Sequence, residues 1–357
     1  MKVGIITITN GENYGNRLQN YAVQEALKDS GIEAETIHKI TNVFDAENHN
    51  YIRKLKLKKI LHYHLTVEER RRLNFYRFTK RYIKKAPFVI DNAIPQGLEN
   101  AYDYFIAGSD QVWNPYLDYC TPANFLTFTK SYKKIAFAPS IAVTEIPEDL
   151  KDNFRKWIGD FRLLSVREES GAKIIEKLCG RAAEVLFDPT LYLSADRWRK
   201  IERKPDFSPS PKKYLLQYFL GKCSKEYKKI IEGYASKNHL EIVQLQTKEH
   251  YDIAPDEFLY LIDHAALVCT DSFHGTVFSI IFKTNFVVFY RMENFADMGS
   301  RIDTLLKKFS MENRYQTEIN DDDLMSTDFS GTDTVIEKER LKTKNFLSKI
   351  DKGERYA

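Results

Sequence analysis

The sequence predicts an α/β protein made of two consecutive open α/β domains, and two observations support this class. Short apolar runs typical of buried strands alternate with amphipathic helical patterns in both halves of the 357-residue chain. A serine- and proline-rich stretch, Ser208–Pro211, interrupts this alternation. We therefore expect a first domain over 1–203 with a basic helical arm at 51–85, a linker over 204–213, a second domain over 214–330 and a C-terminal helix over 331–357.

The first half begins with a strand pattern, Lys2–Thr9, followed by an amphipathic helix over Arg17–Asp29 that ends at Gly31. A second strand, Ala34–Ile40, precedes the basic arm, whose apolar residues are spaced as in helices. The remaining predicted elements of this half are the strands Tyr104–Ala107, Lys134–Ala138, Leu163–Val166 and Ala183–Leu186 and the helix Ala172–Leu178.

The second half repeats the alternation. Its predicted strands are Tyr214–Phe219, Glu241–Gln246, Ala265–Cys269 and Phe286–Tyr290, and its helices are Lys225–Asn238, Pro255–Ala265, 275–282 and Val335–Ile350. Open α/β units of this kind form parallel sheets that bind ligands at the carboxyl ends of the strands. We therefore expect the functional site in a cleft between the two domains.

The formal net charge of +4 is distributed unevenly. Thirteen Lys or Arg residues lie between Tyr51 and Lys85 against Glu68 and Glu69, so the arm carries about +11 and the rest of the chain about −7. Such an arm could bind anionic lipid headgroups, acidic polysaccharide or nucleic acid, or could simply pack one helical face on a domain. No recognised nucleic-acid-binding motif is present, so we expect no nucleic-acid partner.

The remaining composition excludes several classes of protein. The start of the chain has the pattern of a buried strand with no cleavage site after it, and no apolar segment approaches the roughly 18 residues that span a bilayer. The four cysteines are widely separated and form no CxxC motif, so we expect neither disulfides nor zinc. A cytoplasmic enzyme that needs no metal fits these features.

The most distinctive motif follows the apolar run Ala265–Cys269 and leads into a helical pattern. It consists of Asp271, Ser272, Phe273, His274, Gly275 and Thr276. The first turn of a helix favours an anion through its N–H groups and its dipole, and glycine lets a backbone approach a ligand closely. Histidine can hold a proton against a phosphate or transfer one. The alternative is a structural histidine.

Two arginines are candidates for anion contacts. Arg167 follows a predicted strand, where its guanidinium could bind a carboxylate or phosphate through two N–H groups. The alternative for Arg167 is a surface ion pair with Glu168 or Glu169. Arg301 is a second, weaker candidate.

A further polar turn, Gly108–Pro115, follows the strand Tyr104–Ala107. Its candidate residues are Ser109, Asp110, Gln111, Trp113 and Asn114. We expect a sugar-binding or catalytic loop in which Asp110 is a base and Trp113 offers its face to a pyranose ring. The alternative is a turn with a local side-chain hydrogen bond and a tryptophan in the core.

The turn after the first strand has Gly11 and Gly15, but it lacks both the GxGxxG fingerprint and the lysine–hydroxyl ending of a P-loop. These absences exclude a dinucleotide-binding or P-loop assignment. Three residues at the start of the helix, Asn16, Arg17 and Gln19, could contact a ligand, or could only cap and pack the helix.

Taken in order, five segments resemble the bacterial polysaccharide pyruvyl transferase family. They are Asn13–Ala22, Gly108–Asn114, Ser165–Gly171, Asp188–Thr190 and Thr270–Thr276. The resemblance extends from about residue 1 to about residue 315, which is nearly the whole chain. It implies a GT-B-like architecture with two Rossmann-like domains facing across a cleft.

The resemblance also implies an activity. Members transfer the pyruvyl group of phosphoenolpyruvate to two hydroxyls of a sugar, which forms a cyclic ketal and releases phosphate. The acceptor would belong to a capsule or other exopolysaccharide, or to its lipid-linked precursor. Arg167 and His274 match the family's pair that handles phosphoenolpyruvate. Many members carry an arginine two residues before this histidine, where the present chain has Ser272, so Arg301 or Arg291 would have to supply that charge.

From these implications we expect His274 to be the general acid or phosphate partner and Arg167 to hold the donor carboxylate. Gly275 and Thr276 would cradle the phosphate, and Asp110 would receive a hydroxyl proton. Phosphoenolpyruvate is then a donor substrate, and no cofactor is expected. The basic arm could place the enzyme peripherally at the inner face of the membrane. Two alternatives are a GT-B-like glycosyltransferase that uses a nucleotide sugar and a non-catalytic glycan-binding protein. The acceptor sugar, the linkage and the oligomeric state stay open.

Overall fold

The computed structural model describes residues 1–9, 11–40, 49–91, 93–207, 209–291 and 300–351. The chain divides into two compact units, and each is built from separate stretches of sequence. The first unit contains Met1–Asn48, Thr79–Leu193 and Ile336–Ala357. The second contains His49–Phe78 and Ser194–Val335.

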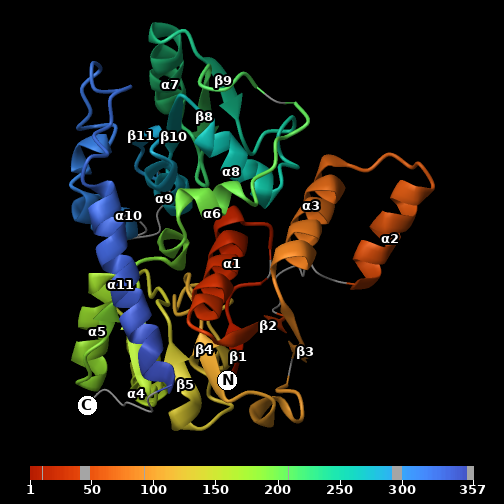
Figure 1. The fold of residues 1–357 in the computed structure, drawn as a ribbon, viewed down its shortest axis with the longest axis vertical. Helices are drawn as coiled ribbons and strands as arrows, with labels where there is room; N and C mark the ends of the chain where they lie inside the picture. Colours follow the sequence, from red (N-terminus) through yellow and green to blue (C-terminus); the bar gives the residue numbers. More distant parts are fainter. Residues whose placement is uncertain (10, 41–48, 92, 208, 292–299, 352–357) are drawn as a thin grey trace. The chain divides into compact units, whose positions relative to one another are not determined.

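The first unit is built on a parallel sheet that has seven strands in the described part of the chain, in the order β3-β2-β1-β4-β5-β6-β7 (Figure 1). Val3 pairs with Ala34 on one side and with Tyr104 on the other, which places β1 in the interior of the sheet. The strands are β1 Lys2–Ile6, β2 Glu33–Lys39, β3 Lys85–Ile90, β4 Tyr104–Ala107, β5 Lys134–Ala136, β6 Leu163–Val166 and β7 Glu184–Val185.

Helix α1 (Tyr14–Asp29) follows β1 and shows why the helices of this unit begin and end where they do. The side chain of Asn13 caps α1 by accepting a hydrogen bond from the backbone N–H of Asn16 at 3.2 Å. After the helix, Gly31 has a φ of +73°, the left-handed conformation that glycine adopts at no steric cost. The other helices of the unit are α4 Lys151–Gly159, α5 Glu169–Cys179 and most of α11 Thr332–Asp351.

The second unit is built on a parallel sheet of four strands in the described residues, in the order β11-β10-β8-β9. The strands are β8 Tyr214–Tyr218, β9 Glu241–Gln244, β10 Leu267–Thr270 and β11 Asn285–Val288. The helices from its longer stretch of sequence are α6 Ala195–Arg199, α7 Lys225–Lys237, α8 Pro255–Asp263, α9 Phe273–Phe282 and α10 Ser300–Phe309. Leu215, Leu267 and Val287 are fully buried in its core, because both faces of a parallel sheet are covered.

Each sheet has a position where the winding of the chain reverses direction. This switch point lies between β1 and β4 in the first unit and between β8 and β10 in the second. In open α/β sheets such points leave a crevice beyond the carboxyl ends of the strands, where ligands bind. The polar motifs after β1, β4 and β10 all occupy these positions. The prediction of an α/β chain with two Rossmann-like sheets is confirmed.

The basic arm forms two helices, α2 (His49–Ile60) and α3 (Val67–Tyr82), which enclose a small apolar cluster of their own. Most of the arm belongs to the second unit rather than the first, which corrects the predicted assignment. The cause is a set of contacts across about 180 residues of sequence. The Arg71 guanidinium donates to the carbonyl of Tyr251 at 2.5 Å, and Asn74 donates to the carbonyl of Asp252 at 2.7 Å.

The predicted domain boundaries also differ at two other places. Helix α6 belongs to the second unit, since Trp198 packs edge-to-face on Phe278 with ring centroids 5.0 Å apart. The C-terminal helix α11 belongs mostly to the first unit, where Lys349 pairs with Glu184 at 2.6 Å. Residue 208 of the predicted linker and residues 352–357 of the predicted C-terminal segment lie outside the described residues. None of the described helices is both long enough and apolar enough to span a membrane.

Candidate functional site

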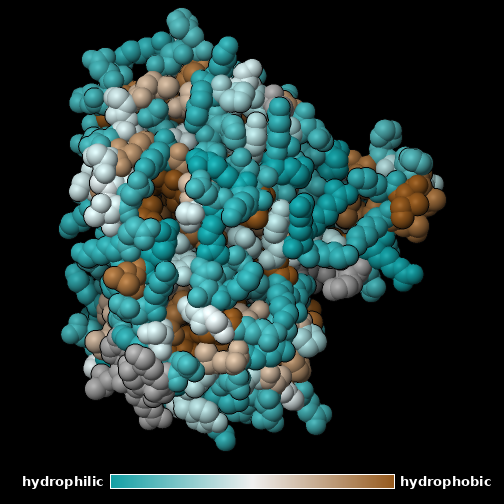
Figure 2. All heavy atoms as spheres, in the orientation of Figure 1, coloured by the Kyte–Doolittle hydropathy of each residue, from teal (hydrophilic) through white to brown (hydrophobic). Residues whose placement is uncertain are grey.

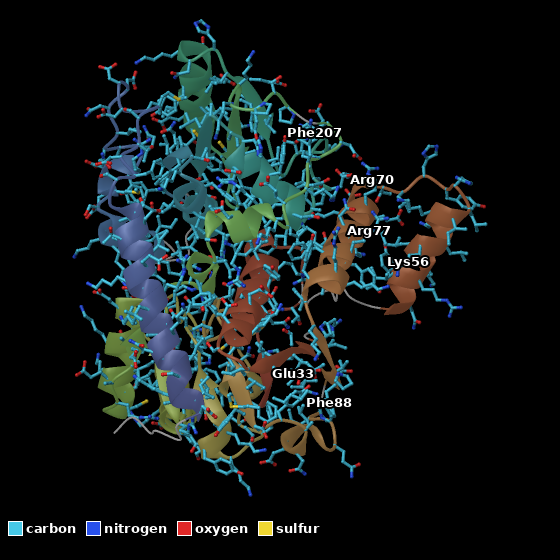
Figure 3. The ribbon with its side chains drawn as sticks, viewed as in Figure 1. Glu33, Lys56, Arg70, Arg77, Phe88 and Phe207 are labelled. Carbon is cyan, nitrogen blue, oxygen red and sulfur yellow. The ribbon has the colours of Figure 1, made fainter. Side chains whose placement is uncertain are left out.

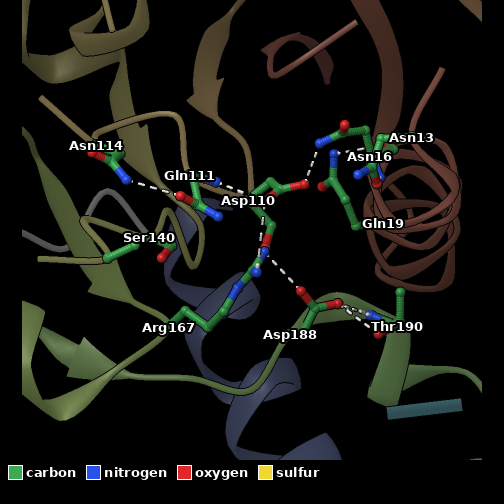
Figure 4. A network of polar contacts seen from close by, with 12 residues as sticks. Asn13, Asn16, Gln19, Asp110, Gln111, Asn114, Ser140, Arg167, Asp188 and Thr190 are labelled. Carbon is green, nitrogen blue, oxygen red and sulfur yellow. Dashed lines mark hydrogen bonds and ion pairs between the residues drawn. The ribbon is translucent and has the colours of Figure 1, made fainter. Parts of the chain in front are cut away.

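Two clusters of polar side chains lie at the two switch points, one in each unit. In the first unit the cluster gathers residues from five strand ends, and Figure 4 shows its hydrogen bonds and ion pairs. At its centre is Asp110, in the turn after β4. In the second unit the cluster occupies the junction between β10 and α9 and includes His274.

Asp110 is a buried carboxylate in an unusual backbone conformation. Its φ is +77°, a region that non-glycine residues seldom occupy and that clusters at functional sites. One carboxylate oxygen accepts from the backbone N–H of Gln111 at 2.8 Å, and the other accepts from the side-chain amide of Asn16 (Figure 4). Its own carbonyl accepts from the backbone N–H of Ser140 at 2.7 Å. These contacts fix the carboxylate between the ends of β1, β4 and β5.

Arg167, directly after β6, is buried and already engaged with the chain. Its Nη2 lies 2.7 Å from the Asp188 carboxylate and also donates to the hydroxyl of Ser109. Its Nη1 lies 3.9 Å from the Asp110 carboxylate. The alternative prediction was a surface ion pair with Glu168 or Glu169, but Arg167 is buried. Glu168 accepts from the backbone N–H groups of residues 141 and 142 at 2.7 and 2.9 Å.

Asp188 was missed as a site residue. It is fully buried as a side chain, and besides pairing with Arg167 it accepts from the backbone N–H and the hydroxyl of Thr190 at 2.9 and 2.6 Å. The signal in the sequence was its position directly after a predicted strand, Ala183–Leu186, like Asp110 and Arg167. All three side chains meet because carboxyl ends of parallel strands lie on one edge of a sheet.

Two of the three residues of the first helix that were predicted to contact a ligand, Gln19 and Arg17, are buried. The Gln19 amide donates to the hydroxyl of Thr7 at 2.9 Å and is fully buried. The Arg17 guanidinium donates to the carbonyl of Gly11 at 2.9 Å and is buried. Asn16, the third of these residues, donates to the Asp110 carboxylate. On the other side of the turn, Asn114 donates to the Gln111 side chain at 2.8 Å and so braces the loop after β4.

The structure contradicts the prediction for Trp113. Its side chain is 0% exposed, and its ring stacks on Phe125 with a centroid distance of 5.3 Å and an interplanar angle of 8°. Its indole N–H donates to the carbonyl of Asn124 at 3.1 Å. Both the ring face and the polar edge are therefore used by the core, and the indole cannot serve as a platform for a pyranose ring.

In the second unit, Ser272 caps α9. Its hydroxyl accepts from the backbone N–H of Gly275 at 3.3 Å, and its carbonyl accepts from the backbone N–H and the hydroxyl of Thr276 at 3.0 and 3.1 Å. These bonds contradict the predicted phosphate cradle at Gly275 and Thr276, since both amides donate to Ser272. Gly275 is needed for another reason: an added Cβ would lie 2.6 Å from the hydroxyl oxygen of Thr270.

His274 lies in the first turn of α9 and is only 7% exposed. Its ring packs edge-on against Phe273 with centroids 5.2 Å apart, and the Arg301 guanidinium of α10 lies 5.5 Å from the Phe273 ring centroid. On the other side, Asp271 binds the end of β8 by accepting from the backbone N–H groups of residues 220 and 221 at 2.6 and 2.8 Å. Asp271 therefore supports the loop rather than pointing toward a ligand.

Arg291 also comes to this junction. Its Nε lies 3.3 Å from the Asp271 carboxylate, and a Cβ at Gly221 would lie 2.8 Å from its side chain, so glycine is needed for this approach. Two guanidiniums, those of Arg291 and Arg301, thus flank the turn that carries His274. Arg167 belongs to the first unit and His274 to the second, so the pairing of these two side chains stays a prediction.

One group of described residues has the spacing of a metal site. Glu202, Asp263 and His264 each place one ligand atom within 4.8 Å of the others. Both oxygens of Asp263 are bound by Arg199 at 2.8 and 3.0 Å, and the Nδ1 of His264 lies 3.0 Å from the carbonyl of Tyr260. Contacts within the protein therefore hold this group together. None of its three residues belongs to the turn between β10 and α9 that carries His274.

Comparison with known proteins decides the family. A family model described as polysaccharide pyruvyl transferase matches residues 13–293, which is most of the chain. The chain belongs to the polysaccharide pyruvyl transferase family. The match covers the turns that carry Asp110, Arg167 and His274 in this transferase. No curated protein matches its sequence.

Solved structures similar to this pyruvyl transferase share little sequence with it. The UDP-GlcNAc 2-epimerase of Methanocaldococcus jannaschii aligns with a TM-score of 0.44 and 14% identity, over 95% of this chain and 99% of the other. The putative epimerase of Listeria monocytogenes aligns with a TM-score of 0.49 and 10% identity, over 100% and 92% of the two chains. The epimerase of Rickettsia bellii gives 0.49 and 12%, over 98% and 97%.

Proposed function

We propose that this transferase moves the pyruvyl group of phosphoenolpyruvate onto two hydroxyls of a sugar, forming a pyruvate ketal and releasing phosphate. The sugar belongs to an exopolysaccharide, such as a capsule, or to its lipid-linked precursor. The family supports pyruvyl transfer to a saccharide, while the donor and the ketal are part of the proposal. We place the reaction in the cytoplasm of a bacterium.

The observation that best supports phosphoenolpyruvate as the donor is the positive charge around the turn that carries His274. An anion near the first turn of a helix is stabilised by the helix dipole, and guanidiniums bind phosphate and carboxylate oxygens strongly. Arg291, which follows β11, and Arg301, which lies in α10, are both close to this turn. They supply positive charge where many family members have an arginine at the position of Ser272.

The proposed chemistry balances in atoms and charge with these groups. His274 donates a proton to the methylene carbon of phosphoenolpyruvate, which makes C2 electron-poor. A sugar hydroxyl adds to C2 and gives its proton to Asp110. Phosphate then leaves with the electrons of the C2–O bond and takes this proton from Asp110, which restores the carboxylate. A second hydroxyl then closes the ketal at C2, and its proton restores His274. General acid–base catalysis by such groups contributes about 10²–10⁴-fold in rate.

We propose a positioning role for Arg167 in place of direct binding of the donor carboxylate. Its guanidinium already lies between the carboxylates of Asp110 and Asp188. Buried charges of this kind are stable only when paired, and a third carboxylate would leave the local negative charge unbalanced. Arg167 would therefore hold Asp110 in place for proton transfer, while the donor carboxylate pairs with Arg291 or Arg301.

The test is coupled phosphate release. Purified protein is mixed with phosphoenolpyruvate and sugar acceptors, free or lipid-linked, and inorganic phosphate and the ketal methyl signal are followed by NMR. We expect acceptor-dependent phosphate release that His274→Asn abolishes. His239→Asn is the matched control, because His239 is an exposed histidine with a φ of +52° that asparagine tolerates.

The alternatives give different results. A nucleotide-sugar glycosyltransferase would be protected against heat by a UDP-sugar rather than by phosphoenolpyruvate, and a ligand at 100 times its Kd adds about 2.7 kcal/mol. A non-catalytic glycan-binding protein would bind sugar without releasing phosphate from any donor. Near-normal turnover by His274→Asn would overturn the assignment of His274.

A further inference from the structure

The end of helix α2 forms an exposed turn with a defined backbone structure. The backbone N–H of Tyr63 donates to the carbonyl of Lys58 at 2.9 Å, and that of His62 donates to the carbonyl of Lys59 at 3.2 Å. His62 has a φ of +57°. These bonds and this conformation constitute a Schellman motif, the common end of a helix. The tip of the arm, residues 57–63, is therefore a turn with a defined backbone.

Helix α2 has two apolar faces, and only one of them is buried. Ile52 and Leu55 pack on Leu73 of α3 and are 2% and 0% exposed. The other face carries three residues at helical spacing, which are Leu57 (55% exposed), Ile60 (71%) and Leu61 (57%). Tyr63, 66% exposed, follows them. Figure 2 shows the resulting brown patch over the end of α2.

Basic residues flank this apolar face. Helix α2 carries Arg53, Lys54, Lys56, Lys58 and Lys59 and no acidic residue. Arg53, Lys54 and Lys59 are exposed, while Lys58 pairs with Glu69 at 2.7 Å. Figure 3 shows Lys56 on α2 and Arg70 and Arg77 on α3. An exposed apolar stripe between cationic side chains is the pattern of a helix that lies in the interface of an anionic bilayer.

The charge pattern favours a lipid surface over other occupants of this face. A second copy of the chain would bring two acid-free helices together, and like charges across an interface oppose association. Nucleic acid binds through phosphate contacts and would leave Leu57, Ile60 and Leu61 in water. An anionic bilayer satisfies both features, because acyl chains accept the apolar side chains and headgroups pair with the lysines and Arg53.

We propose that the end of α2 is a membrane-docking tip for anionic lipid bilayers. Leu57, Ile60 and Leu61 enter the boundary between headgroups and acyl chains, and Arg53, Lys54 and Lys59 contact the headgroups. The binding itself is independent of catalysis. Its use rests on the proposed function, since it would bring the enzyme to a lipid-linked acceptor.

The arm is attached firmly enough for the tip to hold the second unit at a membrane. Besides the bonds from Arg71 and Asn74 to the backbone at 251–252, Arg70 pairs with Asp252 at 2.5 Å. The Arg71 guanidinium also lies 4.6 Å from the centroid of the Tyr251 ring. Docking of the tip therefore restrains the unit that contains His274.

The experiment is sedimentation of the full chain with vesicles of phosphatidylcholine, alone or with phosphatidylglycerol. We expect binding only to the anionic vesicles, weakened by salt because exposed charges are screened. The variant Leu57→Gln/Ile60→Gln/Leu61→Gln should bind roughly tenfold or more weakly, since it removes the inserting side chains while keeping helix-forming residues. Arg53→Gln/Lys54→Gln/Lys59→Gln should also bind more weakly and lose most of the salt dependence.

Matched control variants test whether vesicle binding depends on this tip in particular or on exposed charged and apolar residues in general. Lys225→Gln/Lys228→Gln/Lys229→Gln removes three exposed lysines of α7, and Leu341→Gln removes an exposed leucine of α11. Both should bind vesicles like the unchanged protein. A tryptophan in place of Ile60 should be quenched by brominated lipid, whereas one in place of Leu341 should not.

Three results would overturn the proposal. The first is that the unchanged protein does not bind anionic vesicles. The second is that Leu57→Gln/Ile60→Gln/Leu61→Gln binds them as strongly as the unchanged protein. The third is that this variant changes only the oligomeric state, from dimer to monomer. Phosphate release with a water-soluble acceptor should be the same in the tip variants and the unchanged protein. Failure of docking can therefore be told apart from failure of the proposed transfer reaction.

Discussion

The side-chain amide of Asn16 donates a hydrogen bond to the carboxylate of Asp110, and this bond joins the first turn of α1 to the turn after β4. It crosses the switch point of the first sheet, between β1 and β4. The amide orients the Asp110 side chain by donating a hydrogen bond to one carboxylate oxygen. A base that must accept a proton from a sugar hydroxyl needs such orientation.

Asp110→Asn should lower kcat by about 10²–10⁴-fold, since asparagine cannot accept the hydroxyl proton. The fold should persist, because asparagine has the size of aspartate and its one carbonyl oxygen can still accept from Asn16 or from the backbone N–H of Gln111. Turnover and the denaturation midpoint should both be measured, with Asp322→Asn, at a fully exposed side chain, as the control. A normal kcat in Asp110→Asn would remove Asp110 from the mechanism.

Arg167→Lys separates a positioning role from direct donor binding. A lysine keeps the charge but cannot reach Asp188 and Ser109 with a planar fork of donors. If Arg167 positions Asp110, kcat should fall at least about tenfold while the KM for phosphoenolpyruvate stays nearly constant. The measurement is initial rate against donor concentration. A large rise in KM with little change in kcat would instead assign Arg167 to the donor carboxylate.

Gly275→Ala should destabilise the second unit by about 1–3 kcal/mol, the usual cost of overpacking a core. The new Cβ would lie 2.6 Å from the Thr270 hydroxyl oxygen and 3.2 Å from its methyl carbon. Thr270→Ala removes both atoms, so the double variant should lose less stability than the two single variants together. Urea denaturation of all four proteins tests this coupling. Additive losses would show that the contact is unimportant.

Glu202→Gln should change the dependence of stability on pH. Burial, helped by the charge of Asp263, raises the pKa of the Glu202 carboxyl to about 7. The folded state then binds its proton more tightly than the unfolded state, so the free energy of unfolding falls as pH rises from about 4.5 to about 7. Glutamine cannot ionise, and the variant should be relatively more stable above pH 7, by on the order of 1 kcal/mol after solvent screening.

The quantity to compare is the difference in the free energy of unfolding between the variant and the unchanged protein at each pH. The exposed Glu249→Gln is the control. Taking differences cancels the other titrating groups. The difference should be near zero at pH 4 and should grow through pH 7. A difference that does not vary with pH would show that Glu202 keeps an ordinary pKa in the folded protein.

Local patterns in the sequence were sufficient for most of the framework. The strands Tyr104–Ala107 and Leu163–Val166 were predicted with their observed bounds, because each is a short apolar run that ends in a polar turn. Helix α1 begins three residues before its predicted start, because Asn13 provides the cap. The edge strand β3, Lys85–Ile90, and helix α4, Lys151–Gly159, were not predicted. A proline in β3 weakens the strand pattern.

The residues of the candidate site could be predicted where their position after a strand was sufficient to identify them. Asp110, Arg167 and His274 were found because each follows a strand, and Asp188 could have been found in the same way. The orientation of side chains was not predictable. Whether Trp113 faces solvent or Phe125 depends on packing between segments, and so does the requirement for Gly275, which comes from the approach of α9 to Thr270. The attachment of the arm depends on contacts across 180 residues.

The division of the chain has a consequence for synthesis. The first unit draws its last part from residues 336–357, where Lys342 donates to the carbonyl of Val185 at 2.5 Å and Arg162 donates to the carbonyl of Ile350 at 2.7 Å. Its sheet is translated early, but these contacts form only after the ribosome has released the final helix. The first unit is therefore completed only after the second unit has been synthesised, and no single cut of the polypeptide between the two units yields two intact halves.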